Sequence, residues 1–240
     1  MTKITPAILP QTYRGIEISA EKVIGAVSSV QVDLVDGHFA PNRTWLFNNK
    51  DDDTIELLMH EDMGMPFWDR INYEFDLMVK DPLEHMETFI ALGPSKLIFH
   101  IEGLDTARMI EFFETAPEII KSVIAFGVAI NVDTDISLIE PYIPYIESIQ
   151  CMGIRNIGFQ GQKFDDGVYD HIRSVHARYP DKTIVVDGGV SLENAAMLVS
   201  AGADELVIGS ALFQNDDPHG TIEAFKKVCN QASTQHANSN

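Results

Sequence analysis

Two short apolar runs end in glycines, and one of them also carries a carboxylate. Residues 184–186 run into Asp187-Gly188-Gly189, and residues 206–208 run into Gly209-Ser210. Glycine lets backbone N–H groups approach an anion with no Cβ in the way. An acidic side chain beside such a phosphate cradle is a candidate for chemistry on a phosphorylated substrate.

Other expected strands also carry polar residues near their ends. Residues 30–35 alternate, so Gln31, Asp33 and Val35 share one side of a strand. The further polar residues of this kind are Glu74, Asp76, His100, Glu102 and Asn131. A single Asp at a strand end is more often a helix cap or turn former. Several that converge from separate strands indicate a site, because clustered buried carboxylates repel each other.

The elements that position these residues are eight alternations of strand and helix. The strands are expected at 5–9, 30–35, 71–79, 97–101, 123–130, 148–154, 184–186 and 206–208. This pattern predicts an α/β TIM (β/α)8 barrel as a single domain over residues 1–230, with a doubly wound open sheet as the alternative. In such a barrel the active residues lie at the carboxyl ends of the strands. Residues 231–240 are polar, and we expect a disordered tail.

Composition limits the partners and the location. The 240 residues include 17 Lys and Arg against 36 Asp and Glu, a formal net charge of −19. This charge argues against nucleic acid and anionic membranes as partners, since both require a basic face. No apolar stretch approaches the roughly 18 residues of a membrane span, and no secretory signal is visible. With Cys151 and Cys229 as the only cysteines, a disulfide framework is not expected, and we expect a cytoplasmic protein.

Several motifs resemble those of the ribulose-phosphate 3-epimerases. Residues 32–42, Val-Asp-Leu-Val-Asp-Gly-His-Phe-Ala-Pro-Asn, resemble the central motif of that family. Further segments match in order, and they are residues 75–79, 99–102, 158–164, 186–190 and 209–213. The resemblance covers the chain from about Ile4 to Phe225.

The resemblance implies an epimerase that moves a proton at C3 of a ketopentose phosphate. The substrate pair would be ribulose 5-phosphate and xylulose 5-phosphate, or a close analogue. By motif position, Asp33 and Asp187 are the acid and base on opposite faces of the substrate. The phosphate would rest on backbone groups of Gly158, Gly161, Gly188, Gly189, Gly209 and Ser210. A homo-oligomer is also implied.

Two departures affect the metal site that the resemblance implies. Gln31 and Asp76 stand where the family has metal-binding histidines. The set of metal candidates is therefore Gln31, Asp33, Asp76 and Asp187, and all of its donor atoms are oxygen. Such a set suits Mg²⁺ or Mn²⁺ better than Zn²⁺, and a protein that works without a metal stays open.

Other departures concern the substrate pocket. Pro10 replaces a polar Ser at the end of the first strand, and Gln160 replaces a glycine of the phosphate loop. Residues 43–73 form a longer connection than the family has, which either shapes an altered substrate pocket or is a surface insertion. Two alternatives therefore stay open. One is an isomerase or lyase on another sugar phosphate, and the other is a non-catalytic sugar-phosphate-binding paralogue.

Overall fold

Eight short apolar runs form parallel strands that pair in sequence order, and the last strand closes on the first. The computed structural model describes residues 1–50 and 52–237. The strands are β1 (Lys3–Ile8), β2 (Ser29–Val35), β3 (Asn72–Met78), β4 (Lys96–His100), β5 (Ala125–Ile130), β6 (Ser148–Met152), β7 (Thr183–Asp187) and β8 (Glu205–Ile208). The single-domain TIM barrel that the sequence predicts is confirmed, and the open sheet is excluded.

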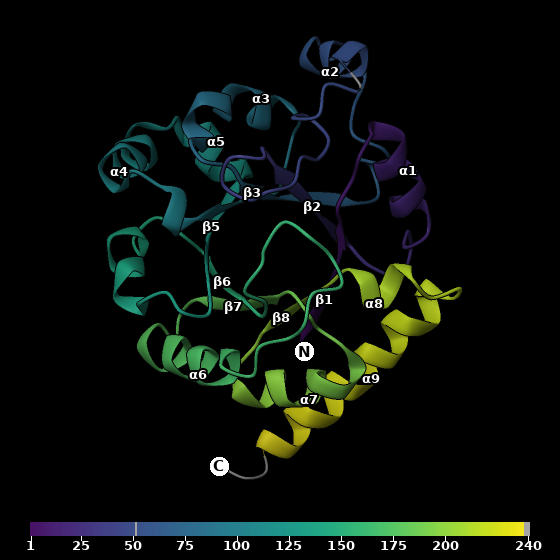
Figure 1. Cartoon of the computed structure of the whole chain (residues 1–240), viewed down its shortest axis with the longest axis vertical. Helices are drawn as coiled ribbons and strands as arrows, with labels where there is room; N and C mark the ends of the chain where they lie inside the picture. Colours follow the sequence, from purple (N-terminus) through teal and green to yellow (C-terminus); the bar gives the residue numbers. More distant parts are fainter. Residues whose placement is uncertain (51, 238–240) are drawn as a thin grey trace.

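Helices surround this barrel on the outside (Figure 1). They are α1 (Tyr13–Glu21), α2 (Asp52–Met59), α3 (Met86–Ala91), α4 (Thr106–Thr115), α5 (Glu118–Val123), α6 (Val168–Arg178), α7 (Leu192–Ala201), α8 (Ser210–Phe213) and α9 (Pro218–Ala237), with the 3-10 turns η1 (Pro82–His85), η2 (Ile101–Gly103) and η3 (Ile136–Tyr142). Side chains satisfy several free N–H groups at the helix starts, as Thr12 does for Gly15 and Asp105 for Arg108. The connection from β6 to α6 crosses the centre of the barrel in Figure 1.

The predicted strand boundaries agree with the structure to within two residues, and two of the differences have a clear physical cause. The strand expected at 123–130 begins at Ala125, since Val123 belongs to α5. The strand expected to reach residue 154 ends at Met152. The chain passes so close to β7 at Gly153 that a Cβ there would lie 2.2 Å from the Gly188 carbonyl oxygen. The segment after β5 forms the 3-10 turn η3, which contains Pro141 and so lacks one N–H donor.

The C-terminal segment also differs from the expected disordered tail. Helix α9 continues to Ala237, and it packs against α7. The reason is a buried stripe at helical spacing, which consists of Ile222, Phe225, Cys229 and Ala232. The last member of this stripe lies beyond residue 230, so packing continues there. Residues 238–240 of the predicted tail lie outside the described residues.

A network of charges occupies the barrel interior at the amino ends of the strands. Lys3 Nζ lies 2.5 Å from Glu74 Oε1 and 3.0 Å from Glu205 Oε1. Lys96 Nζ lies 2.6 Å from Glu74 Oε2 and 3.4 Å from Glu205 Oε2. Both glutamate side chains are almost completely buried. Buried carboxylates need such partners, and the network therefore closes this end of the barrel.

The long connection after β2 is attached to the barrel at its start. The Thr44 hydroxyl donates to the Asp33 carbonyl oxygen and accepts from the Val35 N–H, and Trp45 is fully buried. Farther along, α2 lies at the outer edge of the molecule (Figure 1), and Trp68 is 72% exposed. The first part of the connection therefore supports β2, and α2 lies away from the barrel centre.

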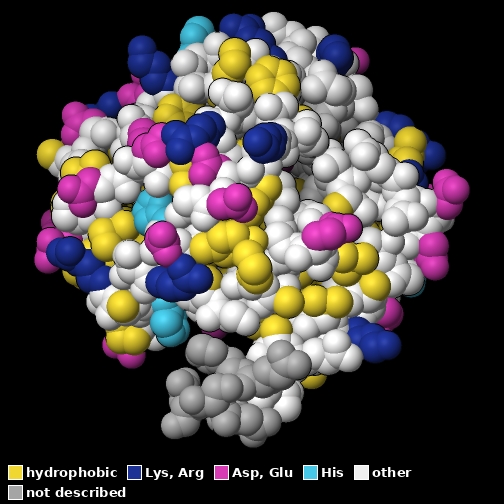
Figure 2. All heavy atoms as spheres, turned by 60° about the horizontal axis from the view of Figure 1, so that its bottom comes forward, with side chains coloured by type: hydrophobic (Ala, Val, Ile, Leu, Met, Phe, Trp, Pro, Cys, Tyr) yellow, Lys and Arg dark blue, Asp and Glu magenta, His cyan; other side chains and the backbone are white. Residues whose placement is uncertain are grey.

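Charged side chains of both signs are mixed on the outer surface (Figure 2). On the face shown in Figure 2, Lys and Arg side chains are scattered among acidic ones and form no continuous basic patch. Among the described residues, no helix combines the length and the hydropathy needed to cross a bilayer.

Candidate active site

Three aspartates from three strands meet inside the barrel. Every residue of β2 is buried, and its alternation turns Gln31 and Asp33 toward the interior. The register of β2 and β3 sets Asp33 level with Asp76, and Asp187 is the last residue of β7. One carboxylate oxygen from each aspartate lies within 4.8 Å of the other two. The structure thus brings together all four predicted metal candidates.

Two buried carboxamides lie against these aspartates. Gln31 Nε2 donates to Asp33 Oδ1 at 2.9 Å and to Asp187 Oδ2 at 2.8 Å, so one amide bridges both predicted catalytic residues. Gln150 Nε2 donates to Asp76 Oδ2 at 3.2 Å and lies 3.5 Å from Asp187 Oδ2. Neither Oε1 atom has a hydrogen-bond partner within the described chain. Each carboxamide therefore has a free oxygen beside the carboxylate cluster.

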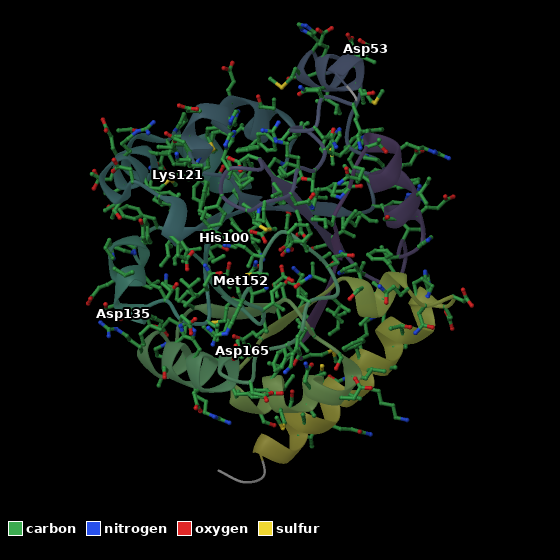
Figure 3. All side chains as sticks on the ribbon, viewed as in Figure 1. Asp53, His100, Lys121, Asp135, Met152 and Asp165 are labelled. Carbon is green, nitrogen blue, oxygen red and sulfur yellow. The ribbon has the colours of Figure 1, made fainter. Side chains whose placement is uncertain are left out.

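An imidazole completes the cluster. His100 Nε2 lies 2.9 Å from Asp76 Oδ1, and both side chains are fully buried. Burial by itself would lower the pKa of His100, but the charge and hydrogen bond of Asp76 outweigh it and raise the pKa. The ring of Phe39 packs on the imidazole at a centroid distance of 5.3 Å. His100 and Met152 lie toward the barrel interior in Figure 3, whereas Asp53 lies at the periphery.

The two predicted catalytic aspartates have raised pKa values. Burial raises the pKa of Asp33 well above its usual value, and the charges of Asp187 and Asp76 raise it further. Burial also raises the pKa of Asp187, to about 7, and the charge of Asp76 adds to this effect. The hydrogen bonds from Gln31 offset only part of these shifts. Near neutral pH the pair can therefore hold and exchange a proton.

A cavity of about 40 Å³ lies above the two aspartates. All six predicted phosphate-binding residues line it, and they are Gly158, Gly161, Gly188, Gly189, Gly209 and Ser210. At Gly189 the φ of 66° and the close approach of Phe164 both require glycine. Glycine-rich backbone and paired carboxylates thus lie around one cavity at the carboxyl ends of the strands.

The connection between β6 and α6 is held over this cavity by two side-chain amides. Asn42 Nδ2 donates to the Gly158 carbonyl oxygen at 2.8 Å. Gln160 Nε2 donates to the Ala7 carbonyl oxygen at 3.0 Å. Both contacts join this connection to segments at the opposite side of the barrel mouth, so together they fix its position over the cavity.

Some polar residues expected at strand ends lie elsewhere. Glu74 belongs to the charge network at the opposite end of the barrel. The Glu102 carboxylate accepts from the Asn131 N–H and the Thr134 hydroxyl, and so caps a surface loop. Gln150 is the residue that sequence reasoning missed. The available signal was a polar side chain at an alternate position of an otherwise apolar strand.

Comparison with known proteins identifies relatives along nearly the whole chain. The Ribulose-phosphate 3 epimerase family matches residues 3–213. Ribulose-phosphate 3-epimerase of Bacillus subtilis (strain 168) is 29% identical over 232 residues, which cover 94% of this chain and 99% of the relative. The cytoplasmic isoform of this epimerase from Oryza sativa subsp. japonica is 26% identical, and the match covers 94% of this chain and 93% of the relative.

Solved structures agree with the fold. The 3-hexulose-6-phosphate synthase from Salmonella typhimurium superimposes with a TM-score of 0.67 at 16% identity. The match covers 96% of this chain and 99% of that one. At so low an identity the likeness shows the barrel architecture alone.

Proposed function

The chain belongs to the ribulose-phosphate 3-epimerase family, and on this premise we propose that it interconverts ribulose 5-phosphate and xylulose 5-phosphate, or a close analogue of this pair. As a member of the family it is a carbohydrate epimerase. The proposed reaction inverts C3, which is adjacent to the C2 carbonyl. Inversion requires that a proton leave on one face of the substrate and that another arrive on the opposite face.

The observation that carries the proposal is the pair of carboxylates at the floor of the cavity. Asp33 and Asp187 come from β2 and β7, and Gln31 hydrogen-bonds to both. Their raised pKa values suit proton transfer near neutral pH, since one carboxylate can be ionised while the other is protonated. The ionised aspartate removes the C3 proton, and its partner delivers a proton to the other face.

The residues present fit a divalent cation. Asp33, Asp76 and Asp187 would hold it, because their oxygens already lie within 4.8 Å of one another. Gln31 Oε1, which is buried and has no described partner, is a further donor once the amide is turned. An all-oxygen set favours Mg²⁺ or Mn²⁺. When bound, such a cation supplies positive charge for the oxyanion that develops at C2 during proton removal.

We assign the other end of the substrate to the glycines around the cavity. Among the described residues, no Lys or Arg side chain lines this cavity, so phosphate recognition would fall to backbone N–H groups. Backbone donors provide local positive potential without changing the strongly acidic charge of the chain. We expect a small phosphorylated sugar as the partner of this site.

The test is proton exchange at C3 of ribulose 5-phosphate in deuterium oxide, followed by NMR. It is run on metal-stripped protein and again after addition of Mg²⁺, Mn²⁺, Fe²⁺ or Zn²⁺. We expect exchange, with appearance of xylulose 5-phosphate, and the strongest restoration by Mg²⁺ or Mn²⁺. A folded protein that exchanges C3 with none of these ions would refute this substrate, and other sugar phosphates would be tried next.

Assembly and location stay predictions. The predicted homo-oligomer is tested by light scattering coupled to size-exclusion chromatography, and a single species of 26.7 kDa would contradict it. The predicted cytoplasmic location is tested by fractionation of cells that express the full chain.

A further inference from the structure

The walls of the active-site cavity offer few polar side chains. Most of the lining side chains are apolar, namely Ala7, Met78, Met152, Ile154, Phe159, Val190 and Val207. Apart from the two aspartates, the polar side chains in the described lining are Gln160, Gln162 and Ser210. A phosphate group loses strong hydrogen bonds to water when it enters such a space and needs donors in return. Each side-chain donor in the lining is therefore a candidate to hydrogen-bond the phosphate.

Gln160 lies at the centre of the phosphate cradle. It is in the connection between β6 and α6, between Gly158 and Gly161, where the family has a further glycine. Much of the Gln160 side chain is exposed, but its carboxamide reaches inward and donates to the Ala7 carbonyl oxygen. A Cβ added at Gly209 would lie 2.8 Å from Gln160 Nε2. The carboxamide therefore occupies space that a phosphate on Gly209 would use.

A phosphate held on Gly209 would compete with this carboxamide for the same space. A phosphate that binds there would displace the Gln160 carboxamide from the Ala7 carbonyl oxygen. Its Nε2 then needs a new acceptor, and the nearest strong one is the incoming phosphate. Exchange of a neutral carbonyl for a charged phosphate oxygen makes a stronger hydrogen bond.

We propose that Gln160 is a phosphate-recognition residue. Its carboxamide donates to the Ala7 carbonyl in the free protein and to the substrate phosphate in the complex. The proposal rests on the proposed function in one respect, that the substrate is a phosphorylated sugar. It adds a side-chain donor to a cradle otherwise made of backbone groups, and so helps to determine specificity for phosphorylated sugars.

The test compares Gln160→Ala and Gln160→Glu with a matched control, Asn156→Ala. Asn156 is an exposed amide of the same connection that does not line the cavity. Titration calorimetry with inorganic phosphate and with ribulose 5-phosphate gives Kd, and steady-state kinetics separate KM from kcat. For Gln160→Ala we expect Kd and KM to rise about 5- to 10-fold, with kcat within about twofold of wild type. Gln160→Glu should lose more affinity, since its carboxylate repels phosphate, and Asn156→Ala should match wild type.

The outcomes separate this proposal from the proposed function. Phosphate binding that is unchanged or tighter in Gln160→Ala overturns the proposal, because Gln160 would then only close the cavity. Phosphate binding that weakens in a protein without C3 exchange supports the role of Gln160 and refutes only the epimerase substrate. A wild-type protein that binds neither inorganic phosphate nor ribulose 5-phosphate overturns both.

Discussion

At the scale of single residues, the active site holds three carboxylates in a space that favours fewer than three negative charges. Two charges 4.8 Å apart repel by about 3–4 kcal/mol at an effective dielectric constant of about 20. A hydrogen bond to a charged group returns only about 1.5–3 kcal/mol. The amides of Gln31 and Gln150 offset the repulsion, but burial of each carboxylate costs several kcal/mol more, so the pKa values of Asp33 and Asp187 stay raised. The imidazolium of His100, a shared proton or a bound cation must complete the balance.

The first prediction concerns Asp187. In Asp187→Asn the side chain keeps its shape but can no longer accept or deliver the proton. We expect C3 exchange to fall about 10²–10⁴-fold, while a sugar phosphate still raises the melting temperature. NMR exchange and thermal melting measure the two effects. A variant that keeps full exchange would remove Asp187 from the chemistry.

A second residue-scale prediction follows from the raised pKa values of the aspartate pair. In metal-free protein the folded state holds a proton up to about pH 7 at Asp187, whereas an unfolded Asp loses it near pH 4. Between these values the folded state binds more protons, so the free energy of unfolding falls as pH rises from about 4 to 7. Urea denaturation at several pH values measures this slope. It should flatten in Asp187→Asn, and equal slopes in the two proteins would contradict the assignment.

At the scale of elements, the strands use the barrel interior in two ways. At their carboxyl ends they collect carboxylates around a cavity, and at their amino ends they pair glutamates with lysines. Lys96 lies between Glu74 and Glu205 and is only 13% exposed. Burial by itself would raise the pKa of Glu74, but Lys96 and Lys3 outweigh it and lower the pKa. This network connects β1, β3, β4 and β8.

The third prediction tests that network with Lys96→Met, which removes one of the two lysines that pair with the buried Glu74 and Glu205. We expect a loss of about 2–4 kcal/mol in the free energy of unfolding at pH 7, measured by urea denaturation. The lowered pKa of Glu74 means that its contribution is present above about pH 4.3 and is lost as pH falls through the folded pKa. The control is Lys121→Met, which removes a surface pair with Glu118 and should cost below about 1 kcal/mol. Equal losses would show that the network contributes no more than a surface pair.

At the scale of the whole molecule, the proposed substrate is acidic and so is the protein. The formal net charge of −19 repels a sugar phosphate at long range, while the cradle attracts it only at contact. Helices surround the barrel on the outside (Figure 1). The net charge of the whole protein therefore governs how fast the phosphate approaches, and the glycines around the cavity govern how it is bound.

The fourth prediction is that kcat/KM rises with ionic strength. Salt screens long-range repulsion, with a Debye length that shortens from about 30 Å at 0.01 M to about 10 Å at 0.1 M, and leaves buried contacts almost unchanged. We expect a severalfold increase in kcat/KM over this range with little change in kcat, measured by steady-state kinetics in NaCl. A decrease with salt would indicate a local positive field at the entrance.

The sequence alone predicted the barrel and most of the site. Alternation in residues 30–35 placed Gln31 and Asp33 on one side of a strand, and glycines after two apolar runs marked the cradle beside Asp187. These inferences succeed because inward orientation and strand ends depend on local patterns that repeat every two residues. The strand pattern also included Asp76 among the polar candidates, and the family resemblance added the proposed roles of the aspartates.

Only the tertiary structure decided which inward-pointing residues meet, because that depends on the register of neighbouring strands. Glu74 and Asp76 both point inward from β3, yet one joins the lysine network and the other meets Asp33. The position of an inward residue along the barrel axis is set by the stagger of all eight strands, which no local pattern reveals. The same cause brings Gln150 and His100 onto Asp76. Gln160 reaches Ala7 only because the β6–α6 connection folds across the barrel mouth.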